Sequence, residues 1–132
     1  MNYNLADTLK ERILILDGGM GTMIQRFKLK EEDYRGDFAK DSPIPQKGNN
    51  DLLCITQPEI IKSIHRQYLE AGADIIETCS FNSQQISLAD YEMQRHVTLF
   101  NKTAAQLARE VADEFTKKNP SNPRFVAGSV GP

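Results

Sequence analysis

The chain has 132 residues and a formal net charge of −2 at pH 7, with 39% hydrophobic and 26% charged residues. This balance is typical of a soluble single domain, and a slightly acidic chain without a basic run has no bulk attraction for nucleic acid. No apolar stretch approaches the roughly 20 residues of a membrane span. The N-terminus has no apolar signal core and the two cysteines form no disulfide framework, so the sequence favours a cytoplasmic protein.

The first predicted elements are a short helix and a strand. Residues 4–11 predict a helix that is capped by Asn2 or Asn4. The four branched aliphatic residues 13–16 predict a strand that is buried on both faces, as in parallel sheets. Residues 20–27 predict another short helix.

An acidic residue and two glycines follow the first strand directly. Gly18 and Gly19 have no Cβ, so the backbone can turn sharply there and a ligand can approach its N–H groups. Asp17 would repel a phosphate group, and Ile24 stands where a dinucleotide-binding loop would place its third glycine. An acid at this turn suits a cationic group such as a substrate ammonium, although a tight turn with a capping Asp is an alternative interpretation.

The middle of the chain alternates between irregular and regular segments. Residues 28–50 show no periodicity, and a loop of about 20 residues in a compact domain is usually functional or disordered. Thr56 and Glu59 predict a capping box for a helix that ends before Gly72. The later elements expected are a strand over 73–77, helices over 83–91 and 97–117, and a strand over 124–127.

Alternating strands and helices predict parallel strands with right-handed crossovers, so the C-terminal ends of all three strands share one rim. Ligands bind at this end of α/β sheets. The rim carries residues 17–19, 77–80 and 128–132. Because the chain stops where its third strand ends, we expect it to be the front part of a larger domain.

Several other side chains have both a chemical and a structural interpretation. The residues Cys54, His65, Cys79 and His96 lack the spacing of a zinc motif. Cys79 is more simply an inert buried thiol than a nucleophile, and Glu77 is as consistent with an ion pair as with a ligand contact. Glu77 also lies too far from the glycines to be the ribose acid of a nucleotide-binding protein.

Four motifs, in their order and spacing, resemble the homocysteine-binding domain of the cobalamin-dependent methionine synthase family. They are DGGMGT at 17–22, GNNDLL at 48–53, EAGADIIET at 70–78 with FNS at 81–83, and AGSVGP at 127–132. The loop Tyr34–Gly36, which leads into the second motif, resembles the corresponding loop of that enzyme rather than that of the betaine-dependent relatives. The resemblance implies a (β/α)8 TIM barrel, of which residues 1–132 form the N-terminal part, about three βα units, incomplete at the C-terminus.

The resemblance also implies a reaction. In the family, a methyl group moves from methylcobalamin to a zinc-bound homocysteine thiolate and gives methionine. Cysteines of later strands hold that zinc, so neither Cys54 nor Cys79 is given a metal role, and no catalytic residue is carried over. Zinc, cobalamin and the methyltetrahydrofolate-binding and cobalamin-binding modules therefore belong to the full-length enzyme, and we expect the 132 residues alone to be inactive.

The resemblance suggests substrate-binding roles for seven residues. Asp17 is similar to the acid near the homocysteine amino group, and Gly18 and Gly19 to the backbone that meets the amino-acid end. Part of the family's pocket wall is matched by four residues of this chain, Glu77, Thr78, Cys79 and Ser80. Positions 79 and 80 depart from the family pattern, where Asn-Thr is frequent. The alternative is a non-catalytic barrel fragment or a small-molecule-binding module that does not use cobalamin.

Overall fold

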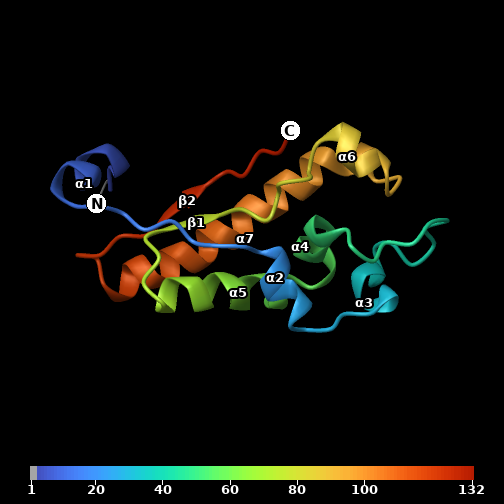
Figure 1. Ribbon diagram of the computed structural model, residues 1–132, viewed down its shortest axis with the longest axis horizontal. Coiled ribbons are helices and arrows are strands. Elements are labelled where there is room, and N and C mark those ends of the chain that lie inside the picture. The colour runs from blue at the N-terminus through green and yellow to red at the C-terminus, as the bar shows by residue number, and fades with distance from the viewer. Residues whose placement is uncertain (1–2) are drawn as a thin grey trace.

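The computed structural model describes residues 3–132 as an α/β arrangement of helices packed on a small parallel sheet (Figure 1). The helices are α1 (Leu5–Glu11), α2 (Gly21–Gln25), α3 (Glu31–Arg35), α4 (Leu53–Thr56), α5 (Pro58–Glu70), α6 (Gln85–Ala89) and α7 (Val97–Lys118). Two 3-10 turns, η1 (Asn50–Leu52) and η2 (Gln94–His96), and two strands, β1 (Ile75–Glu77) and β2 (Phe125–Ala127), complete the elements. No helix in this part of the chain is both long and apolar enough to cross a lipid bilayer.

The strand β1 lies at the centre of the sheet. It pairs in parallel with β2, with Ile75 opposite Phe125 and Glu77 opposite Ala127. On its other side the segment 13–17 runs parallel to it, joined by a single bridge between Leu16 and Ile75. The predicted parallel alignment is therefore confirmed, but the first predicted strand is an extended segment with one bridge rather than a full strand.

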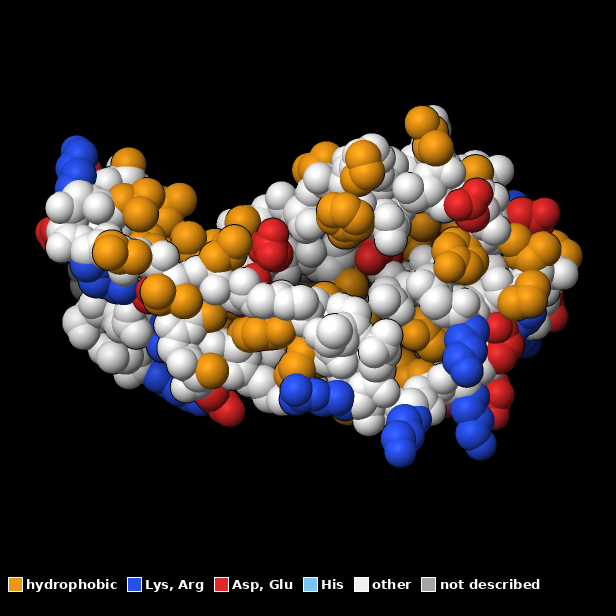
Figure 2. Space-filling model, viewed as in Figure 1, with side chains coloured by type: hydrophobic (Ala, Val, Ile, Leu, Met, Phe, Trp, Pro, Cys, Tyr) orange, Lys and Arg blue, Asp and Glu red, His pale blue; other side chains and the backbone are white. Residues whose placement is uncertain are grey.

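The prediction that residues 13–16 are buried on both faces is wrong. Ile13 is 83% exposed, Ile15 55% and Leu16 51%. The reason is that α5 and α7 cover only one face of the sheet, so side chains on the other face stay open. The segment also lies at the sheet edge, where β1 is its only paired neighbour among the described residues. Figure 2 shows apolar side chains gathered at the end of the molecule that carries α1.

The edge segment is held by a buried carboxylate at the start of β1. Asp74 Oδ2 accepts a hydrogen bond from the Ile15 N–H at 2.9 Å, and Asp74 Oδ1 forms an ion pair with Arg12 at 2.9 Å. Burial alone would raise the pKa of Asp74, but these hydrogen bonds and the Arg12 charge outweigh it, so the pKa lies below its usual value. This attachment keeps the segment parallel to β1 despite the single bridge.

The helices α5 and α7 cover one face of the sheet. Ile76 is fully buried against them, whereas Ile75 and Glu77 point to the other face and are partly exposed. The core between sheet and helices consists of Leu69, Ile76, Ala108, Val111 and Ala112. Both helices match their predicted ranges closely because their apolar residues recur at helical spacing over several turns.

The predicted caps differ in outcome. Asn4 caps α1, since its Oδ1 accepts hydrogen bonds from the N–H groups of Ala6 and Asp7; Asn2 lies outside the described residues. The capping box of α5 is wrong, because Thr56 belongs to α4 and its hydroxyl donates to the Leu52 carbonyl at 3.4 Å. Gly72 has a φ of +111°, which fits the predicted helix end.

The segment 28–50 is ordered by one ion pair. Arg35 of α3 binds the Glu31 carboxylate at 2.6 Å and also donates to the carbonyls of Ser42 and Ile44. Glu31 in turn accepts hydrogen bonds from the N–H groups of Gln46 and Lys47. Residues 28–50, for which the sequence predicts a loop, thus contain the helix α3 and follow a fixed path that leads to η1.

A buried histidine makes stability depend on pH. His65 of α5 is fully buried, and neither ring nitrogen has a hydrogen-bond partner among residues 3–132. Burial lowers the pKa of His65 from 6.5 to about 4. The neutral ring therefore favours the folded state above pH 6.5, and this contribution is lost as the pH falls toward 4.

We predict that the free energy of unfolding of the wild-type protein falls by about 3 kcal/mol as the pH decreases from 6.5 to 4. The His65→Leu variant should not show this decrease. Urea titrations at several pH values measure this. His96→Gln is the comparison variant: burial and the charge of Arg95 lower the pKa of His96 as well, but His96 is only partly buried, so its removal should change the pH dependence less than His65→Leu does. A wild-type dependence that persists unchanged in His65→Leu would contradict the assignment.

Candidate functional site

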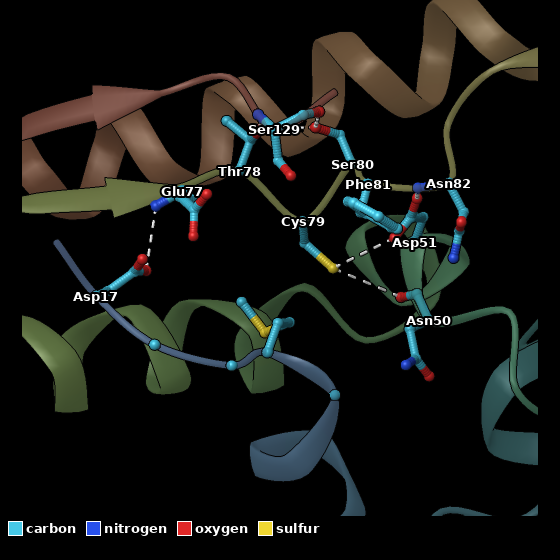
Figure 3. A pocket seen from close by; sticks show the side chains of 14 residues that line it. Asp17, Asn50, Asp51, Glu77, Thr78, Cys79, Ser80, Phe81, Asn82 and Ser129 are labelled. Atoms are coloured by element: carbon cyan, nitrogen blue, oxygen red, sulfur yellow. Dashed lines mark hydrogen bonds between the residues drawn. The ribbon is translucent and has the colours of Figure 1, made fainter. Parts of the chain in front are cut away.

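One pocket of about 460 Å³ lies at the C-terminal ends of the parallel segments (Figure 3). All seven residues predicted from the sequence line it: Asp17, Gly18, Gly19, Glu77, Thr78, Cys79 and Ser80. The parallel alignment brings them together, because it places the turns after residue 16 and after β1 at the same end. That they bind a substrate stays a prediction.

The acid Asp17 has two different carboxylate oxygens. Its backbone N–H donates to the Ile75 carbonyl at 2.9 Å, and its Oδ2 accepts the N–H of Glu77 at 3.1 Å. Its Oδ1 is buried and has no hydrogen-bond partner in the described part of the chain. One oxygen therefore completes the sheet, and the other is a buried acceptor without a partner beside the pocket.

The electrostatics of the pocket raise the pKa of Asp17 to about 6. Burial is the largest cause, and the nearby Glu77 carboxylate adds to it by repulsion. Figure 3 shows the two carboxylates facing each other across the end of the sheet. Two acids in a partly buried place favour a cationic ligand, because a positive charge would stabilise the ionised form of both.

Three polar groups form a closed ring between the turns after β1 and β2. The Ser80 hydroxyl donates to the Ser129 carbonyl at 2.8 Å, and the Ser129 N–H donates to Thr78 Oγ1 at 2.9 Å. Because Ser80 has only one hydroxyl hydrogen, the 2.6 Å contact between Thr78 and Ser80 requires Thr78 as the donor. Both hydroxyl hydrogens are thus used within the protein, so these side chains shape the wall and do not donate to a ligand.

The thiol Cys79 is enclosed on the opposite wall. Its single S–H has two weak acceptors within reach, Asp51 Oδ1 at 3.7 Å and the Asn50 carbonyl at 3.8 Å, while Cys54 donates to the Cys79 carbonyl at 3.6 Å. The neighbouring Cys54 thiol, burial and the charge of Asp51 raise the pKa of Cys79 well above its usual value. Cys79 is therefore a neutral thiol, which fits the interpretation as an inert group.

Sequence reasoning assigned no binding role to seven other residues that line the pocket, although the predicted rim over residues 128–132 included Ser129. The seven are Met20, Gly21, Asn50, Asp51, Phe81, Asn82 and Ser129. Asn50 and Asp51 belong to η1, which lies between the helices α3 and α4 and not directly after a strand. The expectation that ligands bind at the C-terminal ends of strands therefore did not identify them. The turn-rich motif at residues 48–51 was the available signal.

The carboxylate of Asp51 fixes the turn after β1. Asp51 is buried, and its Oδ2 accepts the Asn82 N–H at 2.9 Å and the Ser83 hydroxyl at 2.8 Å. Burial raises the pKa of Asp51, although the hydrogen bonds from Ser83 and Asn82 oppose this. The pocket wall between β1 and α6 is consequently attached to η1.

We predict that Asp51→Ala lowers the free energy of unfolding by about 1–3 kcal/mol, because it leaves the buried Ser83 hydroxyl and the Asn82 N–H without an acceptor. Thermal or urea unfolding measures the change. Asp51→Asn should lose less, since the amide oxygen still accepts. Asp37→Ala, at an exposed position, is the control, and an equal loss in both alanine variants would contradict the role.

The geometry defines a class: an α/β protein with a small acidic pocket at the ends of parallel strands. The family model described as homocysteine S-methyltransferase matches residues 14–132. The chain therefore belongs to the homocysteine S-methyltransferase family.

Solved structures of the homocysteine methyltransferase MmuM from Escherichia coli are similar to the chain. The metallated form matches with a TM-score of 0.74 and 24% identity over 97% of this chain. The oxidized form matches with a TM-score of 0.75 and 25% identity over 99%, and the apo form with 0.63 and 25% over 94%. The chain spans 41%, 41% and 38% of the lengths of these three structures.

Proposed function

We propose that this chain supplies the homocysteine-binding part of an S-methyltransferase and that the pocket holds the amino-acid end of homocysteine. The observation that carries the proposal is the unpartnered Oδ1 of Asp17, a buried acceptor in a pocket of about 460 Å³. The ammonium of homocysteine would donate to this oxygen. The family match over residues 14–132 supports homocysteine as the substrate.

The finer proposal is a cytoplasmic cobalamin-dependent methionine synthase with a (β/α)8 barrel, in which methylcobalamin donates the methyl group. The resemblance of the Tyr34–Gly36 loop and of the GNNDLL motif supports it. The cobalamin and methyltetrahydrofolate modules would be its partners. The alternative proposal is a binding module that takes homocysteine without transferring a methyl group.

The residues described here do not fit the zinc site that the resemblance implies. Among residues 3–132, no three His, Cys, Asp or Glu side chains lie close enough together to hold a metal ion. The proposed role of this chain is therefore to bind the substrate without a metal ion of its own. Asp17 binds the ammonium, and the backbone turn at Gly18 and Gly19 meets the carboxylate. The wall after β1 encloses the ligand.

The proposal predicts that the complete natural protein forms methionine from homocysteine when methylcobalamin is the methyl donor. Methionine is measured by mass spectrometry with a labelled methyl group. Homocysteine binding without methionine formation would favour the non-catalytic module. Failure to bind homocysteine at all would contradict both.

We also predict that Asp17→Asn weakens homocysteine binding by roughly 10- to 150-fold, because one charge-assisted hydrogen bond contributes about 1.5–3 kcal/mol. Calorimetric titration of the complete protein measures it. 4-Mercaptobutanoate, which lacks the amino group, should bind both forms equally. Asp90→Asn, at an exposed position, is the matched control.

The same assignment fixes a pH dependence. The pKa of Asp17 is raised to about 6 in the free protein, so the carboxylate becomes neutral as the pH falls below that value. Homocysteine affinity should then fall, and the Asp17→Asn variant should not show this fall. Equal affinity of both forms at pH 7.5 would mean that Asp17 is only a turn residue.

A further inference from the structure

Tyr68 of α5 contacts the glycine turn at residues 18–19. Its hydroxyl donates to the Gly19 carbonyl at 2.7 Å. A Cβ added at Gly18 would lie 3.1 Å from the Tyr68 hydroxyl oxygen and 3.3 Å from Cε1. The phenol therefore lies against Gly18 and binds the carbonyl of the next residue, although Tyr68 does not itself line the pocket.

The hydrogen bond from Tyr68 fixes the orientation of the peptide group between Gly19 and Met20. In a trans peptide, the carbonyl and the following N–H point in opposite directions; the described residues contain no cis peptide. Figure 3 shows the turn crossing α5, with the labelled side chains of Glu77, Thr78 and Cys79 above it. With the Gly19 carbonyl directed at Tyr68, the Met20 N–H points away from the Tyr68 hydroxyl, and both Gly19 and Met20 line the pocket.

Gly19 lacks a Cβ, so its ψ angle is weakly restricted on one side of this peptide. On the other side, Met20 has a φ of −82°, and its Cβ disfavours a complete reversal of the peptide. The hydrogen bond from Tyr68 therefore sets the tilt of the peptide within the range that Met20 allows. The acceptor that Tyr68 binds is the backbone itself, so a change of the hydroxyl acts on the peptide orientation and leaves the side chains of the pocket in place.

We infer that Tyr68 is a positioning residue, which holds the Met20 N–H toward the carboxylate of the bound amino acid. The inference rests on the proposed function. An α-amino acid carries its ammonium and its carboxylate on one carbon. Asp17 Oδ1 is an acceptor for the first group, and an N–H three residues later along the same turn is a donor for the second. Tyr68 thus selects ligands that carry a carboxylate.

Truncated ligands separate this role from general packing. 3-Mercaptopropylamine has the thiol and the amine of homocysteine but no carboxylate, whereas 4-mercaptobutanoate has the carboxylate but no amine. Tyr68→Phe keeps the ring against Gly18 and removes only the hydroxyl. Calorimetric titration of the complete natural protein and of this variant with the three ligands measures the effect.

The expected result is that Tyr68→Phe weakens homocysteine and 4-mercaptobutanoate by about 3- to 10-fold, the effect of one misdirected donor, and leaves 3-mercaptopropylamine unchanged. Tyr3→Phe, at an exposed position remote from the pocket, is the control and should change none of the three. Thermal unfolding of each variant is recorded alongside.

Two results would overturn the role of Tyr68. Equal weakening of all three ligands would show a structural role only, and unchanged binding of homocysteine would show no role. In both cases wild-type binding of homocysteine leaves the proposed function intact. If the wild-type protein binds none of the ligands, the proposed function fails, and the role of Tyr68 fails with it.

Discussion

The hydrogen bond from the Glu77 N–H to the Asp17 carboxylate is the contact on which the rest of the site depends. At this point the parallel pairing between the edge segment and β1 continues through a side chain, at 3.1 Å, where a backbone carbonyl would otherwise accept. The main chain is thereby released from the sheet at Asp17 and can turn through Gly18 and Gly19. The same carboxylate is kept half-buried, which is unfavourable for a charge unless a cation lies nearby. The Asp17 side chain therefore both completes the pairing of the sheet and favours a cationic ligand.

The sequence predicted the regular elements well where periodicity is long. The helices α5 and α7 and the strands β1 and β2 agree with their predicted positions. In both helices the buried apolar residues recur at helical spacing, and those of α5 and α7 that contact the sheet share a core with Ile76 of β1. The prediction that residues 13–16 are buried was wrong for a different reason. An apolar run favours a strand, but whether other elements cover that strand depends on segments far away in the sequence. The capping box failed because Thr56 was already part of a preceding turn of helix, α4, which no pattern in the sequence separated from α5.

The candidate site was predictable where it depends on topology and unpredictable where it depends on single contacts. Parallel strands bring their C-terminal turns together whatever their side chains, so Asp17 and Glu77 could be assigned to one pocket. The hydroxyl ring of Thr78, Ser80 and Ser129 required distances, since the donor direction follows only from the whole ring. Asp51 is the instructive omission, because its carboxylate acts on residues that lie about thirty positions away in sequence.

The ion pair between Glu31 and Arg35 has a consequence for how the chain meets proteases. Residues 28–50 are charged and rich in turns, the composition that usually marks a site of nicking. A protease must draw several residues of backbone into its cleft in an extended form. Here the carbonyls of Ser42 and Ile44 are bound by Arg35, and the N–H groups of Gln46 and Lys47 by Glu31, so that backbone is not free to be drawn out. The stretch that looks most vulnerable in the sequence is thus protected by two side chains of a five-residue helix.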